Sequence, residues 1–102
     1  MASTEFIASI HAAADSLRED FVRDLQQLIR TPSVSGEEGA AQDVVEAQYR
    51  RLGLDVDRWE PQVSDLVEWA EHFTAVESFV GRPNVVGIWK GAGEGRSIIL
   101  NA

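Results

Sequence analysis

The segment that most constrains the fold of this 102-residue chain is its last apolar run, Ile98-Ile99-Leu100. No polar residue interrupts the run, which is typical of a β-strand that is covered on both faces and lies inside a sheet. Two expected helices and three short expected strands are too few to cover both faces and to pair both edges. The sequence therefore predicts an α/β unit that is incomplete by itself, with residues 1–102 as one part of a larger domain.

The first helical segment is expected over residues 4–30, where apolar residues recur at spacings of three, four and seven along one face. Ser16 and Glu19 have the spacing of a capping box, which would divide the segment into two helices that meet near Asp15. Pro32 ends the pattern, because the residue before a proline avoids the α region.

A second helix is expected after the loop at residues 33–39. Ser35 and Glu38 have capping-box spacing, and Glu37 and Glu38 both suit the positive end of a helix dipole. Gly53 supplies the left-handed residue that ends many helices. One face of this helix is expected to carry Ala41, Val44, Val45, Gln48 and Leu52.

Three strands are expected, over residues 54–59, 85–90 and 97–101, and the last two are expected to form a hairpin through residues 91–95. Residues 63–80 are less regular. Leu66 to Phe73 suggest a short helix, whereas residues 75–80 are ambiguous.

Composition excludes several classes of function. The chain has 9 Lys and Arg against 17 Asp and Glu, a formal net charge of -8, so neither nucleic acid nor an anionic membrane is an expected partner. Without cysteine it has no disulfide and no thiolate. No apolar stretch is long enough to span a membrane, and the first residues lack the features of a secretion signal, so the cytoplasm is the expected location.

Three glycines, Gly91, Gly93 and Gly95, resemble a phosphate-binding loop at first sight. A dinucleotide-binding loop has the pattern G-x-G-x-x-G, so after Gly91 and Gly93 its third glycine would stand at position 96, which is Arg96 here. Such a loop also opens a helix, whereas a strand is expected after this one. A hairpin turn is therefore the favoured interpretation.

The ionisable candidates also have ordinary explanations. His72 follows Glu68 by four residues, and His11 precedes Asp15 by four, but two side chains do not make a metal site. Surface pairs on helices explain both. Helix capping explains Glu37 and Glu38 without a substrate, and burial in a core or cover explains Trp59, Trp69 and Trp89. These residues assign no catalytic or metal-ligating position, and they leave substrate-binding residues unknown.

Four segments occur in a recognisable order: residues 28–39 (LIRTPSVSGEEG), 52–56 (LGLDV), 81–87 (GRPNVVG) and 96–102 (RSIILNA). Together they resemble the N-terminal portion of a family of zinc peptidases and deacylases. The family includes acetylornithine deacetylase, succinyl-diaminopimelate desuccinylase, carboxypeptidase G and aminoacylase. The resemblance covers about residues 17–102 and is weakest over residues 63–80.

The resemblance implies a mixed-sheet α/β/α metallohydrolase whose intact parent hydrolyses an amide bond in N-acyl amino acids or small peptides. Two divalent ions, usually zinc, would activate a bridging water, and a carboxylate base would accept its proton. The parent would be cytoplasmic and can be a homodimer. In this family the apolar strand is followed by His-x-Asp, whose side chains bind the metals.

Ala102 stands at about the position before that His, so none of the family's ligands or catalytic residues falls on a residue of this chain. The family's separate lid or dimerisation domain is absent too. This chain would then be scaffold and inactive alone. The alternative hypothesis is a small acidic α+β module that binds a protein partner through exposed tryptophans and an open sheet edge, without catalysis.

Overall fold

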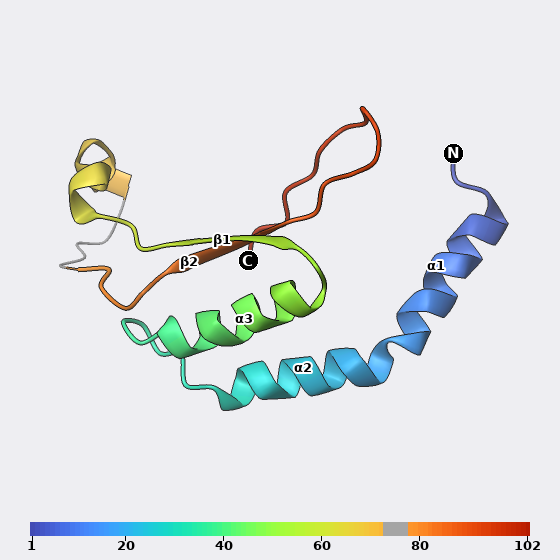
Figure 1. The fold of residues 1–102 in the computed structure, drawn as a ribbon, viewed down its shortest axis with the longest axis horizontal. Helices are drawn as coiled ribbons and strands as arrows, with labels where there is room; N and C mark the ends of the chain where they lie inside the picture. Colours follow the sequence, from blue (N-terminus) through green and yellow to red (C-terminus); the bar gives the residue numbers. More distant parts are fainter. Residues whose placement is uncertain (73–77) are drawn as a thin grey trace.

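The computed structural model describes residues 1–72 and 78–102. These residues form a small mixed α/β protein, in which α3 lies between α2 and a two-stranded antiparallel sheet while α1 projects away from them (Figure 1). The elements, in chain order, are α1 (Thr4–Ser16), α2 (Arg18–Arg30), α3 (Gly39–Arg51), β1 (Asp55–Trp59), the 3-10 helix η1 (Val63–His72) and β2 (Asn84–Ile88).

The expected division of the first helical segment is confirmed, because α1 ends at Ser16 and α2 begins at Arg18. The expected capping box is wrong. The Ser16 hydroxyl donates to the Ala13 carbonyl at 2.7 Å, and no side chain caps the start of α2. The helix stops as expected before Pro32, with Thr31 in an extended conformation.

The predicted C-terminus of α3 is confirmed. Gly53 has a φ of 76°, and its amide donates to the Arg50 carbonyl while the Leu54 amide donates to the Tyr49 carbonyl. This pair of hydrogen bonds defines a Schellman motif, which requires a residue with positive φ. The predicted capping box at the other end is wrong, because α3 begins at Gly39 and no side chain caps it.

The sheet pairs β1 with β2 in an antiparallel register that sets Val56 opposite Gly87 and Asp57 opposite Val86. Alternation along each strand gives the sheet two different faces. Val56 and Gly87 belong to the face that packs on α3, because a Cβ on Gly87 would lie 2.8 Å from side-chain atoms of Tyr49 and Leu54. The opposite face carries Asp55, Asp57, Trp59, Val86 and Ile88.

The predicted third strand and its hairpin are wrong. Residues 97–101 are not in a strand, and Ile98, Ile99 and Leu100 are 83%, 89% and 90% exposed. A strand covered on both faces needs elements packed above and below it. Among the described residues no element covers residues 97–101, so no burial offsets the conformational entropy that this segment would lose on forming a strand. β2 pairs with β1 instead.

The irregular segment is helical in part. η1 covers Val63–His72, in agreement with the expected short helix, although it is a 3-10 rather than an α-helix. Phe73 and residues 75–77 of the ambiguous stretch lie outside the described residues. Within the described ranges, no helix has the length and apolar character needed to cross a membrane.

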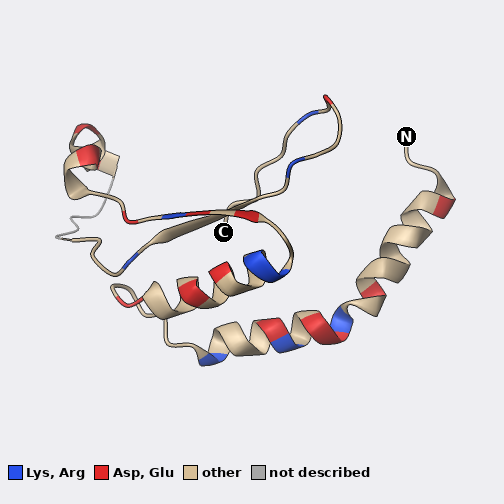
Figure 2. Cartoon of the chain, viewed as in Figure 1, with Lys and Arg blue, Asp and Glu red and all other residues tan. Residues whose placement is uncertain are grey.

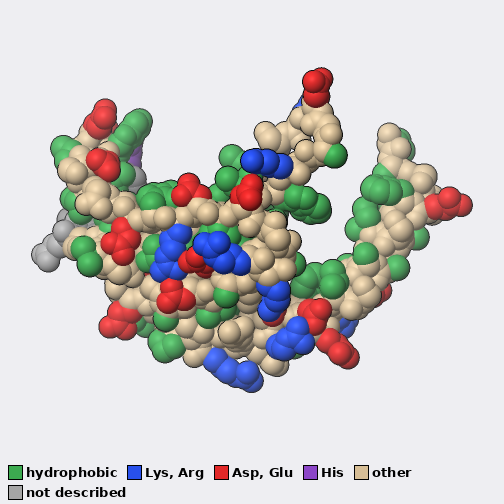
Figure 3. All heavy atoms as spheres, in the orientation of Figure 1, with side chains coloured by type: hydrophobic (Ala, Val, Ile, Leu, Met, Phe, Trp, Pro, Cys, Tyr) green, Lys and Arg blue, Asp and Glu red, His purple; other side chains and the backbone are tan. Residues whose placement is uncertain are grey.

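Apart from Pro83, the described residues bury no hydrophobic side chain, so the expected helix stripes are only partly covered. The chain exposes 9089 Å² of surface, whereas a compact monomer of its mass would expose about 5,700 Å². Its radius of gyration is 17.7 Å, against about 13 Å for a compact domain of this length. Hydrophobic side chains accordingly lie on the surface over α1 and beside the sheet (Figure 3).

We predict that Gly87→Ala destabilises the protein by about 1–3 kcal/mol, because the new methyl group must displace Tyr49 or Leu54. Urea titration of the native gene product, whatever its length, measures the change. The matched control is Gly91→Ala, where a Cβ would meet no atom within 4 Å. Equal unfolding free energies for the two variants would contradict close packing of the sheet on α3.

Candidate functional site

The sequence candidates do not come together in one site. Gly91, Gly93 and Gly95 belong to an open loop after β2, and a Cβ on any of them would meet no atom within 4 Å. His11 and Asp15 are exposed on α1, which contacts only α2 among the helices and strands. The glycines therefore line no close-fitting cradle, and His11 is remote from the sheet.

The imidazole of His72 lies beside a different carboxylate from the expected one. Its Nε2 is 3.5 Å from Glu71 Oε1, and its ring centroid is 6.3 Å from that of Trp69. His72 is 63% exposed, in keeping with a surface histidine. Across residues 1–72 and 78–102, no three His, Cys, Asp or Glu side chains are grouped so that they could hold a metal ion.

The three tryptophans are not buried as the expected core or cover residues would be. Trp59, Trp69 and Trp89 are 43%, 55% and 88% exposed. Trp59 lies on the outer face of the sheet, Trp69 on η1, and Trp89 just beyond the end of β2. No described element covers these surfaces, so the indoles remain available for contact with other protein.

Glu38 has a specific partner that the sequence did not reveal. Its carboxylate accepts two hydrogen bonds from the Arg82 guanidinium, from Nε at 2.8 Å and from Nη2 at 3.0 Å, although the two residues are 44 positions apart. It also accepts the Gly36 amide at 2.9 Å. Both side chains are mostly shielded, with 25% and 30% of Arg82 and Glu38 exposed. We call this bidentate contact the Glu38–Arg82 clamp.

Two further contacts support the clamp. The Arg82 guanidinium carbon lies 5.5 Å from the centre of the Phe79 ring, a cation–π contact. Gly39, the first residue of α3, approaches so closely that a Cβ there would lie 2.6 Å from the Gly81 carbonyl oxygen. The start of α3 and the turn before β2 therefore meet backbone to backbone beside the ion pair.

The clamp changes the acidity of its carboxylate. Hydrogen bonds, first from Arg82 and then from the Gly36 amide, lower the pKa of Glu38 from 4.5 to about 2. Glu38 is therefore ionised at neutral pH and is a poor general base, because such a base works best with a pKa near the working pH. Glu37, its neighbour, is exposed, and its backbone amide donates to the Val34 carbonyl at 2.9 Å.

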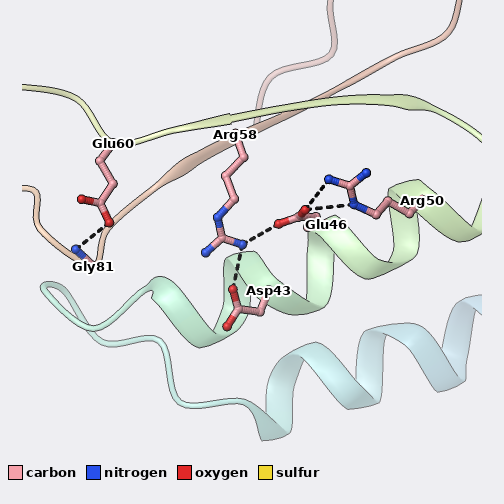
Figure 4. Close-up of polar contacts among 6 residues, drawn as sticks. All are labelled: Asp43, Glu46, Arg50, Arg58, Glu60 and Gly81. Carbon is pink, nitrogen blue, oxygen red and sulfur yellow. Dashed lines mark hydrogen bonds and ion pairs between the residues drawn. The ribbon is translucent and has the colours of Figure 1, made fainter.

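A second charged cluster joins the middle of α3 to β1 (Figure 4). Arg58 Nη1 is 2.7 Å from Asp43 Oδ1 and 2.6 Å from Glu46 Oε2, while Arg50 binds the other oxygen of Glu46 at 2.7 Å. The hydrogen bonds that Arg58 and Arg50 donate lower the pKa of Glu46, and the hydrogen bonds that Arg58 donates to Glu46 and Asp43 raise the pKa of Arg58. The cluster thus attaches a helix to a strand through charge.

Two other contacts complete this arrangement of charges. Glu60 Oε1 accepts the Gly81 amide at 2.9 Å, which closes the long connection between β1 and β2 at its base (Figure 4). Arg51 Nη2 lies 2.7 Å from Asp24 Oδ2 and joins α3 to α2. Acidic and basic residues accordingly occur together on α2, α3 and β1 (Figure 2).

These side chains hold elements together, and among the described residues they form no group that could hold a metal ion. Sequence reasoning missed Arg58 and Arg82 because each pairs with carboxylates 12 to 44 positions away. The only local indication was that Arg82 lies in the GRPN segment. No protein-family model matches the chain, and no solved structure matches it.

We predict that the Glu38–Arg82 clamp loses its stabilising effect in acid. Because the folded pKa of about 2 lies below the ordinary 4.5, the unfolded state takes up the proton first as the pH falls. The contribution is complete above about pH 5 and disappears towards pH 2. The measurement is the difference in unfolding free energy between the wild type and Glu38→Gln in the native gene product, whatever its length. A difference that stays constant from pH 6 to pH 2.5 would refute the assignment.

Proposed function

We propose that this chain is the N-terminal part of the catalytic domain of a cytoplasmic, metal-dependent amide hydrolase that acts on N-acyl amino acids or small peptides. The observation that carries the proposal is the uncovered apolar run Ile98-Ile99-Leu100, whose side chains are 83–90% exposed. The run has the composition of an interior strand, so its exposure in water calls for covering elements. The ordered sequence resemblance assigns those elements to a hydrolase domain.

The exposed surface supports a larger domain. The chain exposes roughly 3,400 Å² more than a compact monomer of its mass. Permanent interfaces between protein partners bury about 2,000–5,000 Å² in total, roughly 1,000–2,500 Å² on each partner, and resemble a domain core cut in half. The excess is larger than one partner's share, so it is large enough for a surface that the remainder of a domain would cover.

The contacts between distant segments also support the proposal. Glu38 lies in the first resembling segment and Arg82 in the third, and the clamp joins them directly. The second segment contains Gly53 and leads into β1, and β1 pairs with the strand of the third segment. Three of the four resembling segments thus form one connected unit, as parts of a single domain would.

The residues of this chain do not by themselves fit a two-metal site. It has no cysteine, and its described part groups no three metal-ligating side chains. In the proposed parent, the ligands and the general base therefore belong to other residues, beginning with a His-x-Asp after Ala102. The role of this chain is to supply α3, the β1–β2 pair and the strand that leads to those ligands.

We predict that the reading frame of the parent gene continues beyond Ala102 with His-x-Asp within a few residues. The expected gene product hydrolyses N-acyl amino acids in the presence of zinc, whereas the 102-residue chain alone does not, because it lacks the ligands. Sequencing and a deacylase assay on both proteins test this. A stop codon directly after Ala102, or zinc-dependent deacylation by the short chain, would overturn the proposal.

An acidic protein-binding module is the second candidate. The exposure of Trp59 and Trp89 favours it, because aromatic side chains are enriched at protein interfaces. Both edges of a two-stranded sheet can also accept another strand. These surfaces fit either a separate partner or the rest of a domain.

Solution behaviour separates the two candidates. We predict that the isolated 102-residue chain associates and melts without a sharp transition, because uncovered apolar segments and open edges favour association. A binding module would instead be monomeric and would unfold cooperatively. Size-exclusion chromatography with thermal circular dichroism distinguishes them. A monomeric chain with a cooperative transition would support the second candidate.

A further inference from the structure

We propose that Glu38 and Arg82 are positioning residues, which set the register of β2 and, through β2, the place of the apolar run Ile98-Ile99-Leu100. The second half of this inference rests on the proposed function, because only a larger domain provides a sheet for that run. The first half depends only on contacts between α3, β1 and β2.

The clamp holds the chain just before β2 begins. Two guanidinium nitrogens of Arg82 bind two different oxygens of Glu38, so this two-pronged contact, the fork, has one preferred orientation. Only Pro83 separates Arg82 from Asn84, the first residue of β2; Pro83 is buried, and its ring restricts its backbone. Any displacement of β2 along its own axis must therefore break or distort the fork.

A second constraint acts inside the strand. Gly87 lies opposite Val56, and a Cβ at this position would be 2.8 Å from Leu54 Cδ1 and from Tyr49 Cδ2. A slip of one residue would bring Val86 or Ile88 to this place and would turn every side chain of β2 to the opposite face. The glycine excludes wrong registers by steric clash, while the clamp stabilises the right one by charge.

An ion pair at one end of β2 and a steric constraint near its other end therefore both fix its register. The clamp lies at its start, where α3 also begins, and Gly87 lies near its end, beside Tyr49 of α3. Residues 89–97 alone connect β2 to the apolar run, so the position of β2 limits where that run can enter a sheet. In the proposed parent, an error in this register would displace the strand that leads to the catalytic residues.

The test measures amide hydrogen exchange at residues 85–88 in the native gene product, whatever its length. In Glu38→Gln and Arg82→Met we expect exchange there to accelerate about tenfold, because a charge-assisted, two-point contact is lost. The exchanged pair Glu38→Arg with Arg82→Glu restores part of the protection. Asp24→Asn, which breaks the 2.7 Å contact of Arg51 between α2 and α3, is the matched control and changes these rates less than about twofold.

A catalytic readout separates positioning from general stability. If the gene product is a hydrolase, kcat falls about tenfold in Glu38→Gln, KM changes less than about twofold, and the exchanged pair recovers part of kcat. Should Arg82→Met fail to fold, Arg82→Lys keeps the charge but loses the fork, and it shows the same acceleration to a smaller degree.

Unchanged exchange at residues 85–88 in both single variants would overturn the inference, and so would an equal acceleration in Asp24→Asn. The proposed function fails by a different result, the absence of deacylase activity in the wild-type gene product. The exchange data remain decisive for the register of β2 in that case, because they do not depend on activity.

Discussion

Ionic contacts between α3 and the sheet are the interaction on which the described fold depends. Glu38 binds Arg82 at one end of the helix, and Asp43 and Glu46 bind Arg58 further along it. Exposed ion pairs contribute little on their own, about 0–1 kcal/mol. Here they are networked and partly shielded, and the packing of Tyr49 and Leu54 against Gly87 adds close contact at the same interface. Charge thus specifies which surfaces meet, while burial remains incomplete.

Incomplete burial is the property of this fold on which the proposed function rests. Hydrophobic burial is the main favourable term in folding, and apart from Pro83 no hydrophobic side chain among the described residues is buried. The uncovered surfaces lie on α1, on the outer face of the sheet and on the run after β2. A scaffold that must join further strands and helices would present such surfaces, and a larger hydrolase domain would supply the cover.

Local patterns in the sequence determined most of the secondary structure. The apolar spacing predicted the helices, Pro32 predicted where α2 ends, and Gly53 predicted the left-handed end of α3, because each depends on residues within one or two turns. Alternation predicted β1, and the turn at Gly81 predicted where β2 begins. Composition also limited the possible catalytic and metal-binding side chains, since the chain has no cysteine and only two histidines.

Tertiary structure alone decided what these elements do with one another. It paired β2 with β1 rather than with residues 97–101. It also placed the Glu38 carboxylate against the Arg82 guanidinium rather than in a capping box at the start of α3. Both outcomes depend on contacts between residues far apart in the chain, whose free energies no local spacing encodes. A carboxylate near a helix start has several partners of similar strength within reach. Only the folded arrangement of α3 and the turn before β2 selects one of them.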